Sequence, residues 1–219
     1  MSKDNSPQEI ERILSLMKKF KETYERVDSV PTLEKLTREQ FKQEAATVDY
    51  TSYVSSAHFH YQVARLRFIF QMHGYALFCS QQTVETYLKA YLKKENVEPP
   101  MSHSLEDLLG LCRSLGNRPA FIDSPYIEII VQKFDPYNEV ARYPVQRTRP
   151  EFLKGWFSVF PEDMHILDYF IYKMREVIQL PDSNLDLFKS GVHIQCPRLR
   201  EDFPYVWGKL TEENINFDS

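Results

Sequence analysis

Apolar residues recur at spacings of three and four positions along most of this chain, which is the period of an amphipathic helix. The first such stripe consists of Ile10, Ile13, Leu14, Met17, Phe20 and Tyr24. Ser6, Pro7 and Glu9 stand where a helix start places its cap, its first-turn proline and its capping-box acid. The pattern therefore predicts a helix over residues 6–27.

Six more helices are predicted downstream. Thr37 and Gln40 form a second capping-box pattern at the start of a short helix. The predicted helices cover residues 37–48, 52–72, 75–96, 101–116, 124–144 and 161–181. We expect His73 and Gly74 to interrupt the chain between the second and third of these, because glycine disfavours a helix interior.

Capping residues are also present in the later helices. Ser104 is expected to cap the 101–116 helix, with Asp107 in the reciprocal position and Gly116 at the end. Ser124 and Pro125 provide a cap and a first-turn proline for the 124–144 helix. Its Ile-Ile-Val run would also suit a strand, but the helical start and the flanking helices favour helix.

The chain shows no alternating strand pattern, and only 6 of its 219 residues are glycine. The sequence therefore predicts an all-α fold, an antiparallel bundle of four or five helices with additional N-terminal helices. Residues 1–49 are expected to form the N-terminal helical extension and residues 50–180 the bundle. Residues 181–219 are expected to form a C-terminal tail that packs on the bundle through Trp207, because an exposed tryptophan is unfavourable.

Composition narrows the class of protein. With 42% hydrophobic residues the chain suits one compact domain, and its net charge of −4 provides no overall basic field for nucleic acid. The three cysteines are far apart, which argues against a disulfide framework and favours a reducing compartment. No apolar run is long enough to span a bilayer. We expect a cytoplasmic protein with no membrane partner.

Motifs for common enzyme sites are absent from the sequence. It contains no glycine-rich phosphate loop, no His-Glu-x-x-His zinc motif and no Gly-x-Ser-x-Gly elbow. His58 and His60 are two positions apart, so on a helix they point to different sides. We therefore expect no cofactor, no metal site and no ordinary hydrolase.

Three short stretches remain as candidates for function. They are "SQQTVETYLKAYL" at residues 80–92, "HSLEDLL" at residues 103–109 and "YNEVARYP" at residues 137–144. Together, and in this order, they resemble the HEPN family, small helical domains named for higher eukaryotes, prokaryotes and nucleotide binding. The matching positions are Gln82, Glu85, Leu88, Lys89, Ala90, His103, Leu105, Leu108, Leu109, Tyr137, Arg142, Tyr143 and Pro144. The resemblance covers roughly residues 50–180.

The resemblance implies a HEPN-like bundle that binds a nucleotide, RNA or a protein partner. It also implies a homodimer, formed by the apolar helix around residues 75–92 or by the Arg-Tyr-Pro corner. Domains of this kind often act beside a small nucleotidyltransferase in toxin–antitoxin or defence modules. The leading interpretation is therefore a non-catalytic binding protein in such a two-component module.

Each candidate residue also has a purely structural interpretation. Glu85 and Lys89 would form a weak ion pair if exposed, whereas a buried pair needs further partners, of which Arg142 is a natural one. The ring of His103 would either cap the next helix or bond a carbonyl there, or face a ligand. Arg142 presents a fork suited to carboxylate or phosphate, and Tyr143 would stack on a base or on a helix.

A basic and aromatic segment follows the Arg-Tyr-Pro motif. Its members are Arg142, Tyr143, Arg147, Arg149, Phe152, Lys154, Trp156 and Phe157. This mixture suits phosphates and unstacked bases, but also a hydrated protein interface. The predicted ligand-binding residues are Glu85, Lys89, His103, Tyr137, Arg142, Tyr143, Arg147 and Arg149.

Ribonucleases of the same family carry an Arg followed, after four to six residues, by a His. No His follows Arg142 until His165, and the only formal match joins Arg67 to His73. On one helix two positions six apart point away from each other, so this pair is a poor catalytic site. Two alternatives stay open: a metal-independent endoribonuclease that uses Arg142 or Arg67 with His73, His103 or His165, and a purely structural scaffold.

Overall fold

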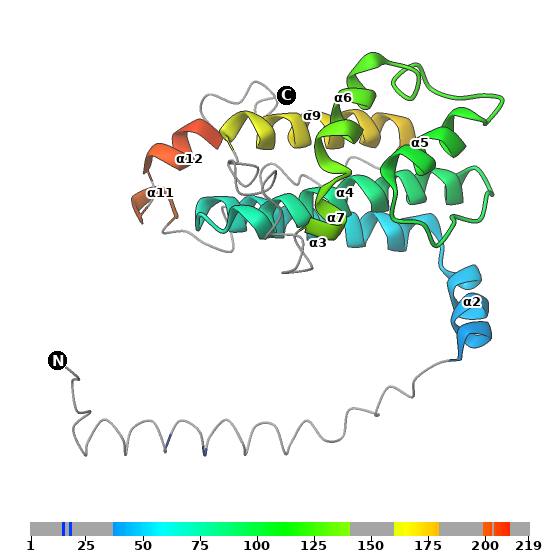
Figure 1. Cartoon of the computed structure of the whole chain (residues 1–219), viewed down its shortest axis with the longest axis horizontal. Coiled ribbons are helices and arrows are strands. Elements are labelled where there is room, and N and C mark those ends of the chain that lie inside the picture. The colour runs from blue at the N-terminus through cyan, green and yellow to red at the C-terminus, as the bar shows by residue number, and fades with distance from the viewer. Residues whose placement is uncertain are drawn as a thin grey trace. The chain divides into compact units, whose positions relative to one another are not determined.

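The computed structural model describes residues 37–140, 160–179, 199–202 and 204–210, together with Ser15 and Lys18. Every regular element in this part of the chain is a helix (Figure 1), which confirms the predicted all-α class. The helices are α2 (Arg38–Thr47), α3 (Tyr50–Ile69), α4 (His73–Lys94), α5 (Leu105–Arg113), α6 (Pro125–Phe134), α7 (Tyr137–Val140), α9 (Pro161–Ile178), α11 (Leu199–Asp202) and α12 (Pro204–Leu210).

The chain divides into two compact units, Met1–Glu44 and Ala45–Ser219. In the first unit, the predicted helix over residues 6–27 lies outside the described residues except for Ser15 and Lys18, which are both helical. The second predicted capping box is confirmed. The amide of Thr37 donates to Gln40 Oε1 at 2.8 Å, and the amide of Gln40 donates to Thr37 Oγ1 at 3.2 Å.

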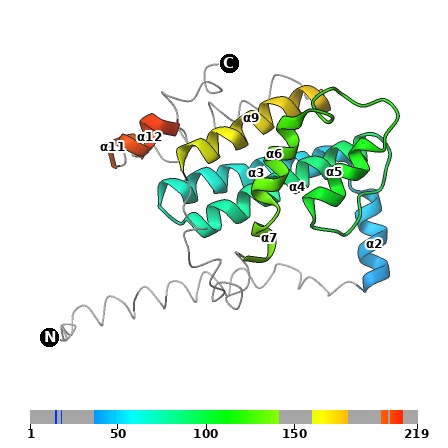
Figure 2. The same ribbon diagram turned by 45° about the horizontal axis from the view of Figure 1, so that its top comes forward.

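The centre of the second unit is the antiparallel hairpin of α3 and α4, which lie side by side (Figure 2). The predicted interruption at His73 and Gly74 is wrong, because these residues form the first turn of α4. The break lies just before them, where Gln71 adopts a left-handed conformation with φ 57°. The Met72 amide then donates to the Arg67 carbonyl at 2.8 Å, which closes α3 as a Schellman motif without glycine.

The N-terminal cap of α5 is formed as predicted, but the reciprocal contact involves a different serine. Ser104 caps α5 as expected, because its hydroxyl accepts from the Asp107 amide at 3.1 Å. The reciprocal contact is made by Ser102, whose Oγ accepts from the Ser104 amide at 3.1 Å and donates to Asp107 Oδ2 at 3.3 Å. The helix also ends at Arg113, before the predicted stop at Gly116.

The predicted 124–144 helix is two helices, α6 and α7. Pro136 has no amide to continue the ladder of α6, so the helix stops at Phe134. Ser124 does not cap α6 with its side chain, because its hydroxyl donates to the Phe121 carbonyl at 2.7 Å. The last part of the predicted helix, from residue 141 on, lies outside the described residues.

Helices α5, α6, α7 and α9 pack around α4, and α12 packs on α9. The largest fully buried side chains are Tyr61, Tyr87, Tyr91, Phe134 and Phe170, followed in size by several Ile and Leu residues. Trp207 of α12 is 5% exposed and belongs to the same core cluster. The predicted division at residues 49/50 and 180/181 stays a prediction.

One ion pair lies inside this core. Arg65 Nη1 of α3 is 2.5 Å from Asp168 Oδ2 of α9, and both side chains are almost completely buried. The Tyr61 hydroxyl donates to the same carboxylate, and Arg65 Nη2 donates to the Leu210 carbonyl at 3.2 Å. The pair therefore ties together three helices that are far apart in the sequence.

None of the described helices combines the length and the apolar character that a membrane crossing requires. Cys79 and Cys112 are buried free thiols. Burial raises the pKa of Cys79 to about 11 and that of Cys112 to about 12, so neither is a reactive thiolate.

Candidate functional site

The predicted Glu85–Lys89 pair is the centre of a polar cluster on α4. Lys89 Nζ lies 2.8 Å from Glu85 Oε1, and their side chains are only 13% and 6% exposed. The interpretation as an exposed ion pair is therefore wrong. The side chains meet because residues four positions apart lie on one face of a helix.

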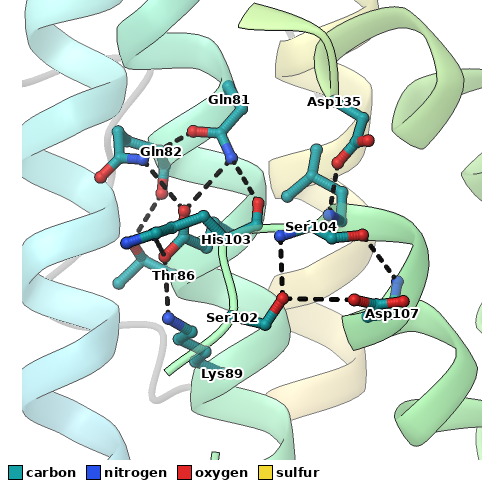
Figure 3. Close-up of polar contacts among 11 residues, drawn as sticks. Gln81, Gln82, Thr86, Lys89, Ser102, His103, Ser104, Asp107 and Asp135 are labelled. Carbon is teal, nitrogen blue, oxygen red and sulfur yellow. Dashed lines mark hydrogen bonds and ion pairs between the residues drawn. The ribbon is translucent and has the colours of Figure 1, made fainter. Parts of the chain in front are cut away.

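Two glutamines complete the carboxylate's hydrogen bonds. Gln81 and Gln82 lie four and three positions before Glu85, and each donates from Nε2 to Glu85 Oε2, at 3.2 and 3.0 Å. Figure 3 shows these amides and Lys89 converging on one point of α4. A buried carboxylate needs such donors, because an unpaired charge in the interior is strongly destabilising.

The fourth side chain comes from the loop between α4 and α5. His103 Nδ1 is 2.9 Å from Glu85 Oε1, and the His103 carbonyl accepts from Gln81 Nε2 at 3.0 Å. The expectation that the ring caps the next helix or bonds a carbonyl is wrong, because it bonds a carboxylate. The side chain of His103 is 47% exposed, so about half of it is accessible to solvent.

Burial by itself raises the pKa of Glu85, but the hydrogen bond and charge of Lys89, followed by those of His103, outweigh it and lower the pKa. The carboxylate is therefore ionised at neutral pH, and its charge is balanced by Lys89. Half-buried His60 of α3 lies within electrostatic reach: burial lowers the pKa of His60, while the charge of Glu85 raises it.

The loop that carries His103 is anchored on its other side. Asp135, at the end of α6, accepts from the Leu105 amide, and Ser102 joins Ser104 to Asp107 (Figure 3). Helices α4, α5 and α6 therefore all contribute to the position of His103.

The other predicted site residues have different locations. Tyr137 of α7 is 7% exposed and belongs to the core, a position that suits packing on α4. Burial raises its pKa, and the charge of Asp163 adds to this. Arg142, Tyr143, Arg147 and Arg149 lie outside the described residues, so a contact between Arg142 and Glu85 stays a prediction.

Gln81 and His60 are neighbours of Glu85 that were not among the predicted site residues. Gln81 sits one turn before the carboxylate, a spacing that the sequence shows. His60 lies on a different helix, and no local spacing reveals it. His58 and His60 do separate as expected, since His58 is buried and lies 2.5 Å from the Tyr87 hydroxyl.

Arg67, His73 and His165, which the endoribonuclease alternative would use, do not form an Arg–His pair with one another among the described residues. Arg67 and His73 do not lie on one helix, as the sequence-based comparison assumed, because α3 ends at Ile69 and α4 begins at His73. Arg67 Nη1 is 2.9 Å from Met72 Sδ, and the His73 ring stacks on Phe68. His165 Nε2 is 2.7 Å from the Lys209 carbonyl.

Most of the apolar α4 side chains that were predicted to form the dimer interface pack in the core of the chain itself. Val84, Tyr87, Leu88, Tyr91 and Leu92 of α4 are buried in the chain's own core, so they are not available to a second copy. Tyr75, at 53% exposure, is the large exposed side chain of α4. Within the described ranges, no group of three His, Cys, Asp or Glu side chains has a metal-binding arrangement.

Comparison with known proteins identifies the family. No curated protein and no solved structure matches this chain. A family model does match: the HEPN domain, over residues 50–180. The matched region is more than half of the chain and contains the whole Glu85–His103 cluster. The protein therefore belongs to the HEPN domain family.

Proposed function

We propose that this protein is a cytoplasmic, non-catalytic HEPN-type binding protein that contacts a nucleotide or RNA. The observation that carries the proposal is the Glu85–Lys89–His103 cluster, in which a half-exposed ring is fixed on a buried carboxylate. Membership of the HEPN family supports a nucleotide or RNA as the ligand.

The cluster alone does not attract an anion, because Glu85 and Lys89 cancel each other's charge. Phosphate contacts would come from the basic segment that follows α7, with Arg142, Arg147 and Arg149. Val140, at the end of α7, is the last described residue before this segment, and α7 packs against α4, the helix that carries Glu85. The aromatic residues of the same segment would stack on bases.

The absence of the family's ribonuclease signature after Arg142 supports a role without cleavage. In this proposal Arg142 would order the bundle or hold an anion. A binding protein needs only this affinity, whereas cleavage also needs a positioned acid and base.

Thermal shift with ATP and GTP tests the proposal. A ligand at about 100 times its Kd adds about 2.7 kcal/mol of stability, which gives a clear rise in Tm. We expect this rise for the wild type and a smaller one for Arg142→Ala and for Arg147→Ala/Arg149→Ala. Arg113→Ala is the matched control, because Arg113 lies in an exposed pair with Glu128, and it should keep the full rise. Equal shifts in all four proteins would place the phosphate site elsewhere.

We also propose that the protein acts in a two-component toxin–antitoxin or defence-like module. Its protein partner there would be a small nucleotidyltransferase, and the chain itself would form a homodimer. Phe59, Phe70 and Tyr75 are exposed aromatic side chains that would contribute to such contacts. The neighbouring gene would be the first check, followed by co-expression with its product. A strictly monomeric chain that does not co-purify with a neighbouring nucleotidyltransferase would contradict this part of the proposal.

One observation favours a second function, metal-independent cleavage of RNA. His103 Nδ1 faces a buried carboxylate, the arrangement that orients a histidine base in many enzymes. Incubation of RNA with the purified chain and EDTA tests this function. Cleavage that His103→Ala abolishes would establish it, and intact RNA would remove it.

A further inference from the structure

A groove lies between α5 and α6, which pack against each other. Its lining residues stand at positions i, i+3 and i+4 of each helix, so each set occupies one helix face. They include Glu106, Leu109 and Gly110 of α5 and Glu128, Val131 and Gln132 of α6. The groove has a volume of about 220 Å³, below the roughly 300 to 1,000 Å³ of pockets that hold small-molecule ligands. It therefore suits one long side chain better than a nucleotide.

The groove carries an excess of negative charge. Arg113, which also lines it, places Nη1 2.7 Å from Glu128 Oε1, so these two charges offset each other. Arg113 Nε donates to the Ile122 carbonyl at 2.9 Å. Neither Glu106 nor Gln132 has a bonded side chain among the described residues, so both Glu106 oxygens and the Gln132 carbonyl oxygen are available acceptors. The groove therefore favours a cation and disfavours a phosphate.

Gly110 lies in the interior of α5, where glycine costs stability relative to alanine. A Cβ atom at this position would meet nothing within 4 Å among the described residues, so packing inside this part of the chain does not require glycine. Glu106 and Arg113 stand four positions before and three after it, which places residue 110 on the groove face. Glycine also serves where a ligand approaches the backbone closely, and this use fits its place in the groove.

The groove has an apolar floor and exposed apolar neighbours. Leu109 and Val131 line it and are almost completely buried. A floor of this kind packs against the methylene stem of a long side chain whose charged head reaches polar acceptors. Leu111 of α5 and Ile129 of α6 stand next to lining residues in the sequence and are 39% and 55% exposed. They would contribute apolar contacts to a chain that carries such a side chain.

We propose that the groove between α5 and α6 binds an arginine side chain of a partner protein. A guanidinium presents five donors in a planar fork, which suits the two free oxygens of Glu106 and the carbonyl oxygen of Gln132. A lysine ammonium is a point charge with three donors and uses these acceptors less fully. Arginine is also enriched in protein interfaces, whereas lysine is depleted. The groove shares no residue with the proposed nucleotide site, so the two sites are tested separately.

NMR titration of the nitrogen-15-labelled full chain with Nα-acetyl-arginine amide tests the groove. We expect saturable shifts of the Leu109, Gly110 and Val131 amides, with a Kd on the order of 1 mM. Nα-acetyl-citrulline amide has nearly the same shape but no charge, and it should bind about tenfold more weakly. Nα-acetyl-lysine amide should also bind more weakly than arginine. A pentapeptide with arginine at its centre and leucine at both ends should bind more tightly, through Leu111 and Ile129.

Two pairs of variants separate binding from folding. Glu106→Gln should weaken the binding of arginine amide about tenfold. Glu162→Gln is its control and should not, because Glu162 is also an exposed glutamate in the first turn of a helix but lies on α9. Gly110→Ala should weaken binding and yet raise Tm by about 2 °C, because alanine favours the helix but fills part of the groove. Gly116→Ala, in equally open surroundings outside the groove, should leave the affinity unchanged.

Arginine amide that shifts no amide of the groove would overturn the proposed site, and so would unchanged affinity in Glu106→Gln. Citrulline or lysine that binds as tightly as arginine would overturn the assignment of a guanidinium. A pentapeptide that binds more weakly than the single amino acid would contradict a protein as the partner. None of these outcomes depends on whether ATP, GTP or RNA binds, so they leave the proposed nucleotide-binding function to its own test.

Discussion

His103 Nδ1 lies 2.9 Å from Glu85 Oε1, which joins the loop before α5 to the middle of α4. The two residues are 18 positions apart, and Glu85 is buried while His103 is half-exposed. This pair connects the core of the bundle to its surface, so the properties of the site depend on the stability of the fold around it.

Replacement of the buried carboxylate tests its structural contribution. Glu85→Gln keeps the size of the side chain but removes the charge that Lys89 and His103 share. We expect a loss of about 2 kcal/mol in the free energy of unfolding, measured by urea denaturation, because hydrogen bonds to buried charges are strong. Glu98→Gln is the control: Glu98 pairs with Lys93 at 56% exposure, so its loss should cost less than about 1 kcal/mol. Equal costs would contradict the account of the cluster.

The free energy of unfolding should depend on pH because His58 is buried. Burial and then the charge of Arg175 lower the pKa of His58 from 6.5 to about 4, so the native ring is neutral. The unfolded chain takes up the proton first, and the free energy of unfolding should fall as the pH drops from 6.5 to about 4. The expected loss is about 2 to 3 kcal/mol. His58→Gln should remove this slope, and an unchanged slope would assign it to other groups.

The Arg65–Asp168 pair should respond differently to single and double replacement. Asp168→Asn leaves Arg65 buried without its counter-charge, and we expect a loss of about 3 to 5 kcal/mol. Arg65→Met/Asp168→Leu removes both charges and should recover much of this loss. Urea denaturation of the wild type, of the single variants Arg65→Met and Asp168→Leu and of the double variant measures the coupling. A double variant as unstable as the sum of the singles would show that the two residues act independently.

A substitution in the turn between α3 and α4 should stabilise the protein. Gln71 has φ 57°, a conformation that is unfavourable for a residue with a Cβ atom. Gln71→Gly should raise the free energy of unfolding by about 1 kcal/mol. The same change at Asn96, with φ 59°, should give a smaller gain, because asparagine tolerates this region better. A destabilised Gln71→Gly protein would contradict the assigned turn.

The positions of the helices follow from local sequence where caps and periodicity agree. Pro161 begins α9 as predicted, and the Thr37–Gln40 box begins α2. The break after α3 was misplaced because Gly74 is a stronger local signal than Gln71, whose left-handed conformation depends on how the hairpin packs. Local patterns predict helices well and their ends less well for this reason.

The candidate site could not be predicted from local residue spacing alone. Glu85 and Lys89 are visible as a pair four positions apart, but their burial depends on the helices that surround α4. The contact of His103 with Glu85 joins two chain segments, and only the family resemblance pointed to both. Arg65 and Asp168 are 103 positions apart, and no pattern in the sequence relates them.

Binding of a labelled single-stranded RNA to the purified full chain tests the central claim most directly. Fluorescence anisotropy gives the Kd at low and at moderate salt, and a gel of the same samples shows whether the RNA stays intact. We expect saturable binding that weakens as salt rises, because arginines contact phosphates, and RNA that remains uncut. RNA that fails to bind even at low salt, in an assay where ATP and GTP also give no rise in Tm, would contradict the proposed function.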